Sequence, residues 1–209
     1  MLSEIQVCEH SNSKSEAESE YVAVPYERLD KHDAALLIVD LQVGLAAAVR
    51  DWDATFYKNA IFAHAGIGLI YDLPVVITTS VEVGPNGPLP KEILEMYPNA
   101  PYIARLGEVD AWDNEDFRAA VKATNRSQMI IAGITTDVCV TQLALSLRSE
   151  GYHVAVNIEA SGTFNQRVAE AALMRMQAAG AQIMNFFSIN AELFRDVSSA
   201  EIILCVPCR

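Results

Sequence analysis

The sequence has few basic residues, and this shortage limits the partners that the protein can recruit. Lys and Arg total 15 against 27 Asp and Glu in 209 residues, which gives a net charge of −12 at pH 7. Binding to nucleic acids or to anionic membranes requires clustered Lys and Arg, because contacts with phosphates dominate the affinity. We therefore expect neither a nucleic-acid partner nor a membrane partner.

Long apolar runs and targeting signals are also missing. No segment is apolar over the roughly 20 residues that a membrane-spanning helix needs. The N-terminal region contains the polar stretch 11–16 in place of the apolar core of a signal peptide. These features predict a cytoplasmic protein.

Cysteine is scarce, and its distribution argues against a disulfide scaffold. The four cysteines lie at positions 8, 139, 205 and 208. They are too few and too unevenly spaced to cross-link a chain of this length, so we expect reduced thiols. Cys205 and Cys208 have the spacing of a redox motif, but they follow no strand–helix junction, which leaves their role open.

The motifs that bind nucleotides or activate a serine are absent. Gly66-Ile67-Gly68 lies inside a predicted helix and lacks the third glycine of a dinucleotide-binding loop. The sequence contains no Gly-x-Ser-x-Gly elbow and no Walker loop. We therefore expect no cofactor.

The residues that are present predict an α/β fold. Continuous apolar runs rich in β-branched residues indicate strands that are buried on both faces, and they alternate with longer helical patterns. Joined by right-handed crossovers, they predict a three-layer α/β/α fold with a central, mostly parallel sheet of about six strands. The expected strands are 35–39, 75–79, 102–104, 129–132, 154–158 and 182–186, with helices near 57–71, 115–124, 138–150 and 166–179.

A single domain accounts for most of the chain. About half of the residues are apolar, which is enough to form a substantial core. We expect this domain to span 21–196, between a mobile Ser- and Glu-rich tail over 1–20 and a C-terminal tail over 197–209. The Pro- and Gly-rich segment 81–114 is a candidate wall of the functional site, because compact domains rarely keep long loops without a use.

Three chemically active residues follow predicted strands. Asp40 ends the first strand, Arg105 ends the edge strand, and the strand at 129–132 leads into Cys139. Ligands of open parallel sheets bind beyond the carboxyl ends of the strands, so these side chains are expected at one rim. The alternatives are a structural cysteine, a carboxylate that caps a loop and a cation paired with a surface carboxylate.

Cys139 is also expected in the first turn of a helix. Thr136 or Asp137 is a candidate N-cap, which would place the thiol beside unpaired backbone N–H groups and the positive end of the helix dipole. A base, a cation and a helix N-terminus each favour the thiolate, which is the reactive form of cysteine. Cys139 is therefore a candidate nucleophile.

Several motifs together resemble the isochorismatase-like cysteine hydrolases, and in particular their YcaC-like branch. Three of them run from Leu36 to Gln42, from Tyr102 to Arg105 and from Ala132 to Val140, and the resemblance covers roughly 21–196. It implies hydrolysis of a C–N bond of a small amide-type substrate through a covalent acyl intermediate. It also implies a homo-oligomer built as a ring or as stacked rings.

The resemblance assigns roles to individual residues. Cys139 would be the nucleophile, Asp40 the base and Arg105 the cation of a triad. The amides of Thr135 and Cys139 would form the oxyanion hole, after a cis peptide bond between Ile134 and Thr135. The residues expected to bind substrate are Gln42, Asn86, Trp112 and Thr136.

Two departures from the wider superfamily set limits on this interpretation. Most members have Lys where this chain has Arg105, which leaves open a binding-only oligomeric protein, and isochorismate-type cleavage of a vinyl ether is a further alternative. The metal-dependent members carry histidines after the second strand, whereas Val81-Glu82-Val83-Gly84 follows here. With its histidines dispersed at 10, 32, 64 and 153, the chain is expected to bind no metal ion.

Overall fold

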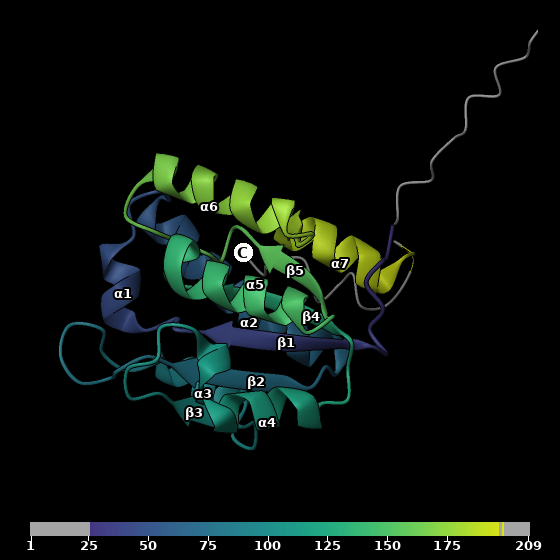
Figure 1. Ribbon diagram of the computed structural model, residues 1–209, viewed down its shortest axis with the longest axis horizontal. Coiled ribbons are helices and arrows are strands. Elements are labelled where there is room, and N and C mark those ends of the chain that lie inside the picture. The colour runs from purple at the N-terminus through teal and green to yellow at the C-terminus, as the bar shows by residue number, and fades with distance from the viewer. Residues whose placement is uncertain (1–25, 197, 199–209) are drawn as a thin grey trace, which may run out of the picture.

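Six parallel strands form the middle layer of the protein (Figure 1). The computed structural model describes residues 26–196 and residue 198. The strands lie in the order β3-β2-β1-β4-β5-β6, and every neighbouring pair is parallel. This confirms the predicted three-layer α/β/α fold. The strand bounds are β1 Ala34–Val39, β2 Val75–Thr79, β3 Tyr102–Ala104, β4 Gln128–Gly133, β5 His153–Asn157 and β6 Gln182–Met184.

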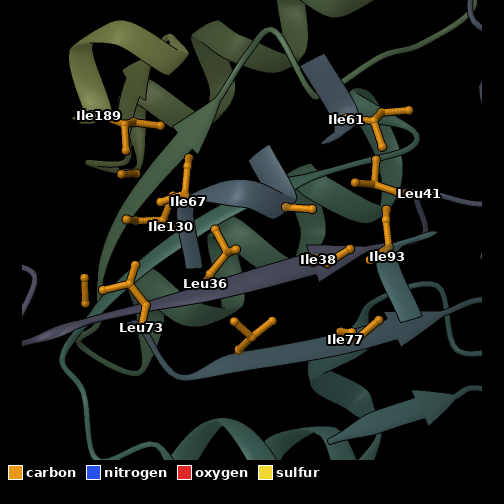
Figure 2. Close-up of a cluster of buried hydrophobic side chains, with 14 of the residues drawn as sticks. Leu36, Ile38, Leu41, Ile61, Ile67, Leu73, Ile77, Ile93, Ile130 and Ile189 are labelled. Atoms are coloured by element: carbon orange, nitrogen blue, oxygen red, sulfur yellow. The ribbon is translucent and has the colours of Figure 1, made fainter. Parts of the chain in front are cut away.

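The central strand β1 shows why these runs form a buried sheet. All six of its residues are buried, and Leu36 lies opposite Val75 of β2 and Ile130 of β4. Successive side chains point to opposite faces of a strand, so each face contributes to a separate core. Leu36 and Ile38 belong to one cluster, shown in Figure 2, and Leu37 and Val39 belong to the other.

Helices cover both faces of the sheet. Side chains of α2, α3 and α7 fill the cluster that contains Leu36, and side chains of α4, α5 and α6 fill the opposite cluster. A three-residue 3-10 turn, η1, and a wider five-residue turn, η2, precede α4 and α5. The bounds are α1 Val43–Ala48, α2 Ala54–Tyr71, α3 Lys91–Met96, η1 Ala111–Asp113, α4 Glu115–Ala123, η2 Thr136–Val140, α5 Thr141–Ser149, α6 Gln166–Ala178 and α7 Phe186–Phe194.

The last predicted strand was too long at its C-terminal end. It ends at Met184, and Asn185 then caps α7 by accepting a hydrogen bond from the backbone N–H of Ser188. The apolar pair Phe186-Phe187 suited a strand equally well by sequence pattern, and the cap decides for a helix. The helices α1, α3 and α7 were not predicted.

Two glycines directly follow the C-cap residues of α5 and α6. Gly151 and Gly180 have φ angles of 89° and 85°, which belong to the left-handed region that residues with a Cβ adopt only with strain. Among the described residues, no helix is both long and apolar enough to cross a membrane. The predicted N-terminal tail lies outside the described residues, as does the predicted C-terminal tail apart from residue 198.

Candidate active site

The candidate site lies where the strand order reverses. From β1 the chain adds β2 and β3 on one side, and it then adds β4, β5 and β6 on the other side. In open parallel sheets this reversal leaves a crevice between the carboxyl ends of the two central strands. Asp40 directly follows β1, and the segment that carries Cys139 directly follows β4.

Asp40 and Arg105 form a fully buried ion pair. The Nη2 group of Arg105 contacts both carboxylate oxygens of Asp40, and neither side chain is exposed to solvent. Arg105 therefore pairs with the buried carboxylate at the end of β1 rather than with a surface carboxylate. The backbone of Asp40 has a φ of 53°, a left-handed conformation that Asp adopts more readily than most residues.

The remaining donors of Arg105 bind groups within the protein. Its Nε donates to Thr78 Oγ1 over 3.0 Å, and its Nη1 donates to the backbone carbonyls of Glu108 and Val109. A guanidinium has five N–H donors, so these contacts and the two to Asp40 engage all of them. Arg105 thus fixes the position and charge of Asp40 and leaves no donor for a ligand.

The thiol of Cys139 completes the cluster, and its pKa is shifted by burial, by Asp40 and by Arg105. Burial raises the pKa of Cys139 to about 12, and the charge and hydrogen bond of Asp40 act in the same direction, against Arg105 and the backbone N–H of Thr135. The surroundings therefore favour the neutral thiol in this state, whereas we expected them to favour the thiolate. Burial also raises the pKa of Asp40, against the opposing effect of Arg105, which makes this carboxylate a better proton acceptor.

The turn η2 holds the sulfur near the backbone N–H of Thr135. The peptide bond between Ile134 and Thr135 is cis, as the resemblance implies, and the backbone N–H of Thr135 lowers the pKa of Cys139, against the effect of burial. The turn is closed by Val140 N–H, which donates to the carbonyl of Thr135 over 3.2 Å. Our prediction of the N-cap was wrong: Thr135 occupies that position without a side-chain bond, and Asp137 accepts a hydrogen bond from Thr163.

Comparison with known proteins places this arrangement in a family. The isochorismatase domain model matches residues 34–186. The chain belongs to the isochorismatase family. It is 51% identical over 172 residues to the probable hydrolase YcaC of Escherichia coli K12. This alignment covers 82% of this chain and 83% of the relative. The predicted family and its YcaC-like branch are therefore confirmed.

Two solved YcaC structures also have the same fold. YcaC from Pseudomonas aeruginosa, solved with hexane-2,5-diol and covalent acrylamide, is 55% identical with a TM-score of 0.82 over 84% of this chain and 87% of that one. Escherichia coli YcaC, described as an octameric hydrolase of unknown specificity, is 49% identical with a TM-score of 0.85 over 88% and 91%. The chain is thus a hydrolase of the isochorismatase family.

Gln42 and Asn86 lie near the site as parts of its scaffold. Gln42 is fully buried, and its amide nitrogen donates to the carbonyls of Val81 and Gly87 while its oxygen accepts from the N–H of Ser80. Asn86 Nδ2 donates to Ser80 Oγ over 3.0 Å. Because its amide is fully engaged, Gln42 shapes the loop after β2 and has no free donor for a substrate.

Trp112 and Thr136, the two other predicted substrate-binding residues, lie in different places: Trp112 packs in the core, and Thr136 lies in the same turn as Cys139. The ring of Trp112 packs edge-on against Phe117 and Tyr152 in the core. Tyr152 directly precedes β5, so this contact lies toward the amino ends of the strands, opposite the rim that carries Asp40. Thr136 belongs to η2, and its buried hydroxyl has no hydrogen-bond partner in the described structure.

Exposed apolar side chains that were not predicted lie in the segments that follow β1 to β5. Among them, Val83 and Leu106 are 86% and 92% exposed. Thr78, which accepts the Arg105 hydrogen bond, was also missed, because a threonine at the end of an apolar strand gives no distinct sequence signal. The exposed apolar residues in these segments are Val43, Val81, Val83, Leu106, Val109, Val138 and Phe164.

Proposed function

We propose that this chain is a metal-independent cysteine hydrolase that cleaves a C–N bond of a small amide-type substrate. Cys139 is the nucleophile, Asp40 is the base, and Arg105 holds the charge and orientation of Asp40. One observation carries the proposal: a buried carboxylate, held in place by Arg105 and with its pKa raised by burial, acts directly on the thiol of Cys139. A weak nucleophile needs such a positioned base to become reactive.

The first half of the proposed reaction forms a thioester. Asp40 accepts the proton of Cys139 as the sulfur attacks the carbonyl carbon, and the resulting oxyanion accepts hydrogen bonds from the amides of Thr135 and Cys139. The tetrahedral intermediate collapses, the C–N bond breaks, and the protonated Asp40 returns its proton to the leaving nitrogen. An acyl group then remains on the sulfur.

The second half regenerates the thiol. Asp40 takes a proton from a water molecule that attacks the thioester, and the carboxylic acid leaves as the proton passes to the sulfur. The whole cycle consumes one amide and one water, and it produces one acid and one amine. Arg105 stays protonated throughout, because a guanidinium does not release its proton in proteins.

The relatives support a reactive cysteine. Acrylamide is an electrophile that reacts with thiolates, and the Pseudomonas aeruginosa YcaC structure contains covalent acrylamide. The exposed apolar side chains in the segments after β1 to β5 suit a substrate whose amide carries a small apolar group. The octameric Escherichia coli relative supports a homo-oligomer for this chain, which light scattering coupled to size exclusion tests directly.

The experiment is a hydrolysis panel of aliphatic amides and nitriles, with isochorismate included. Wild type is expected to release ammonia or amine from at least one amide, and Cys139→Ser is expected to be at least 100-fold slower. Cys205→Ser is the matched thiol control and keeps wild-type activity. Hydrolysis of isochorismate alone, or equal amide turnover by Cys139→Ser, would contradict the proposal.

A further inference from the structure

Thr78 contacts both members of the buried ion pair. It lies in β2, opposite Val39 of β1 on one side and Ile103 of β3 on the other. Its hydroxyl accepts a hydrogen bond from Nε of Arg105 over 3.0 Å, and its carbonyl accepts one from the backbone N–H of Asp40 over 2.9 Å. One residue of the sheet therefore holds the side chain of the cation and the backbone of the carboxylate.

The hydroxyl of Thr78 has one orientation that satisfies its neighbours. A hydroxyl has one hydrogen to donate and two acceptor positions. The Nε of Arg105 can only donate, so the hydroxyl accepts there, and its own hydrogen goes to the carbonyl of Ile103 over 2.9 Å. Thr78 is fully buried and Arg105 is 1% exposed, so solvent water cannot substitute for the hydroxyl.

The guanidinium of Arg105 depends on this acceptor for its orientation. The group is planar and rigid, so the position of Nε sets the plane in which Nη2 meets Asp40. The other anchors, on Nη1, are the carbonyls of Glu108 and Val109, which belong to no helix or strand. Thr78, in contrast, belongs to a strand that is paired on both sides. Its hydroxyl therefore ties the plane of the guanidinium to the sheet.

We propose that Thr78 is a positioning residue for the proposed hydrolysis. Its hydroxyl orients Arg105, which in turn holds Asp40 in the orientation that accepts a proton from the thiol. This inference rests on the proposed function, because it takes Asp40 as the base. Loss of the hydroxyl would leave a buried N–H without an acceptor, and such groups are costly enough to favour a shifted arrangement of the ion pair.

The test measures the addition of acrylamide to Cys139 in the intact assembly as a function of pH. Acrylamide is an electrophile that reacts with thiolates. The sulfur bonds to its terminal alkene carbon, and Asp40 takes the thiol proton, which ends on the adjacent carbon. Peptide mass spectrometry gives the rate at Cys139, with Cys205 in the same sample as the reference. The assay needs no hydrolysable substrate, so it is independent of the amide panel.

Two pairs of variants separate the hydroxyl of Thr78 from its packing. Thr78→Val keeps the shape and removes the hydroxyl, whereas Thr78→Ser keeps the hydroxyl and removes the methyl group. We expect Thr78→Val to slow the addition at pH 7 by about fivefold or more, which is the effect of about one hydrogen bond. Thr78→Ser is expected to react at the wild-type rate. Thr78→Ala and Thr78→Ser form the second pair, which differs only in the hydroxyl.

The pH profile is a readout that a loss of packing alone does not move. Arg105 and Cys139 are the titratable side chains that act on Asp40, and Arg105 lowers its pKa. A displaced Arg105 therefore lets this pKa rise, so the rate in Thr78→Val falls off at a higher pH on the acid side. The control Thr124→Val removes a hydroxyl that donates to a backbone carbonyl of α4, and it keeps the wild-type rate and profile.

The outcomes separate the role of Thr78 from the proposed hydrolysis. Slower addition in Thr78→Ser than in Thr78→Val, or the wild-type profile in Thr78→Val, would overturn the role of Thr78. Wild-type Cys139 that adds no acrylamide would overturn both the proposed nucleophile and the role of Thr78. Addition that depends on the hydroxyl, with no amide of the panel hydrolysed, would support the positioning of Asp40 by Thr78 and contradict only the proposed hydrolysis.

Discussion

His64 is expected to make the stability of this protein depend strongly on pH. The ring is completely buried between α2 and the sheet, where Nε2 contacts the carbonyl of Leu37 over 3.2 Å and Nδ1 lies 3.4 Å from the amide nitrogen of Asn157. The carbonyl can only accept, so Nε2 carries the hydrogen and Nδ1 is unprotonated. Burial lowers the pKa of His64 from 6.5 to about 4.

The sign follows from the two protonation states. Between these pKa values the unfolded chain binds a proton at His64 and the folded chain does not, so lowering the pH favours unfolding. The stabilisation present above pH 6.5 is lost as the pH falls toward 4. At about 1.4 kcal/mol per pH unit, this window corresponds to about 3 kcal/mol of unfolding free energy.

Urea unfolding followed by circular dichroism measures this effect. Wild type and His64→Gln are compared at pH 7.5, 6.5, 5.5 and 4.5 at one protein concentration, because dissociation of an oligomer would also change the apparent stability. His64→Gln is less stable at pH 7.5, since it loses packing, but its stability falls less steeply with acid. Parallel pH profiles for the two proteins would refute a neutral buried His64.

Three further predictions concern the candidate active site and its support. Asp40→Asn removes the proposed base, so amide hydrolysis is expected to fall at least 100-fold, and hydrolysis at the wild-type rate would contradict its role. Arg105→Gln leaves a buried carboxylate without its counter-charge and is expected to lower the unfolding free energy by about 3–5 kcal/mol. Urea titrations measure this, and an unchanged unfolding free energy would show that the ion pair is dispensable for stability. Gly133→Ala would place a Cβ 2.1 Å from a backbone oxygen of β1, so it is expected to lower the melting temperature and the activity. Gly66→Ala is the control: its Cβ would meet no atom within 4 Å, and it is expected to raise the melting temperature slightly. The reverse order of the two melting temperatures would contradict the close approach of β4 to β1.

The sequence predicted the sheet because its strands are buried on both faces. Four of the six strands, β1, β2, β4 and β5, are buried at every residue, whereas β6 is only partly buried and β3 is an exposed edge strand. The two six-residue helices α1 and α3 escaped prediction because their N-cap residues, Gln42 and Pro90, make no side-chain cap, so no start signal precedes them. Their positions depend on tertiary contacts that a local pattern does not contain.

The site residues that could be predicted are those whose positions follow from the order of the strands. Asp40 and Arg105 were found because each follows a predicted strand at the edge where ligands of parallel sheets bind, and the structure pairs them with each other. Trp112 was assigned to the substrate from a motif alone, and its packing against Phe117 and Tyr152 is a contact between segments distant in sequence. A motif identifies a position in the family, whereas the direction of its side chain is fixed by the fold.

The arginine at position 105 is compatible with turnover in the proposed reaction. The protons in that cycle move between Cys139, Asp40, the leaving nitrogen and water, so the cation never has to release one. Its five donors hold Asp40, Thr78 and the loop after β3, a set of contacts that the three N–H groups of a lysine cannot reproduce. An arginine in place of lysine therefore holds the proposed base Asp40 more firmly. The negative charge that develops on the substrate oxygen in the transition state is stabilised by the backbone amides of Thr135 and Cys139.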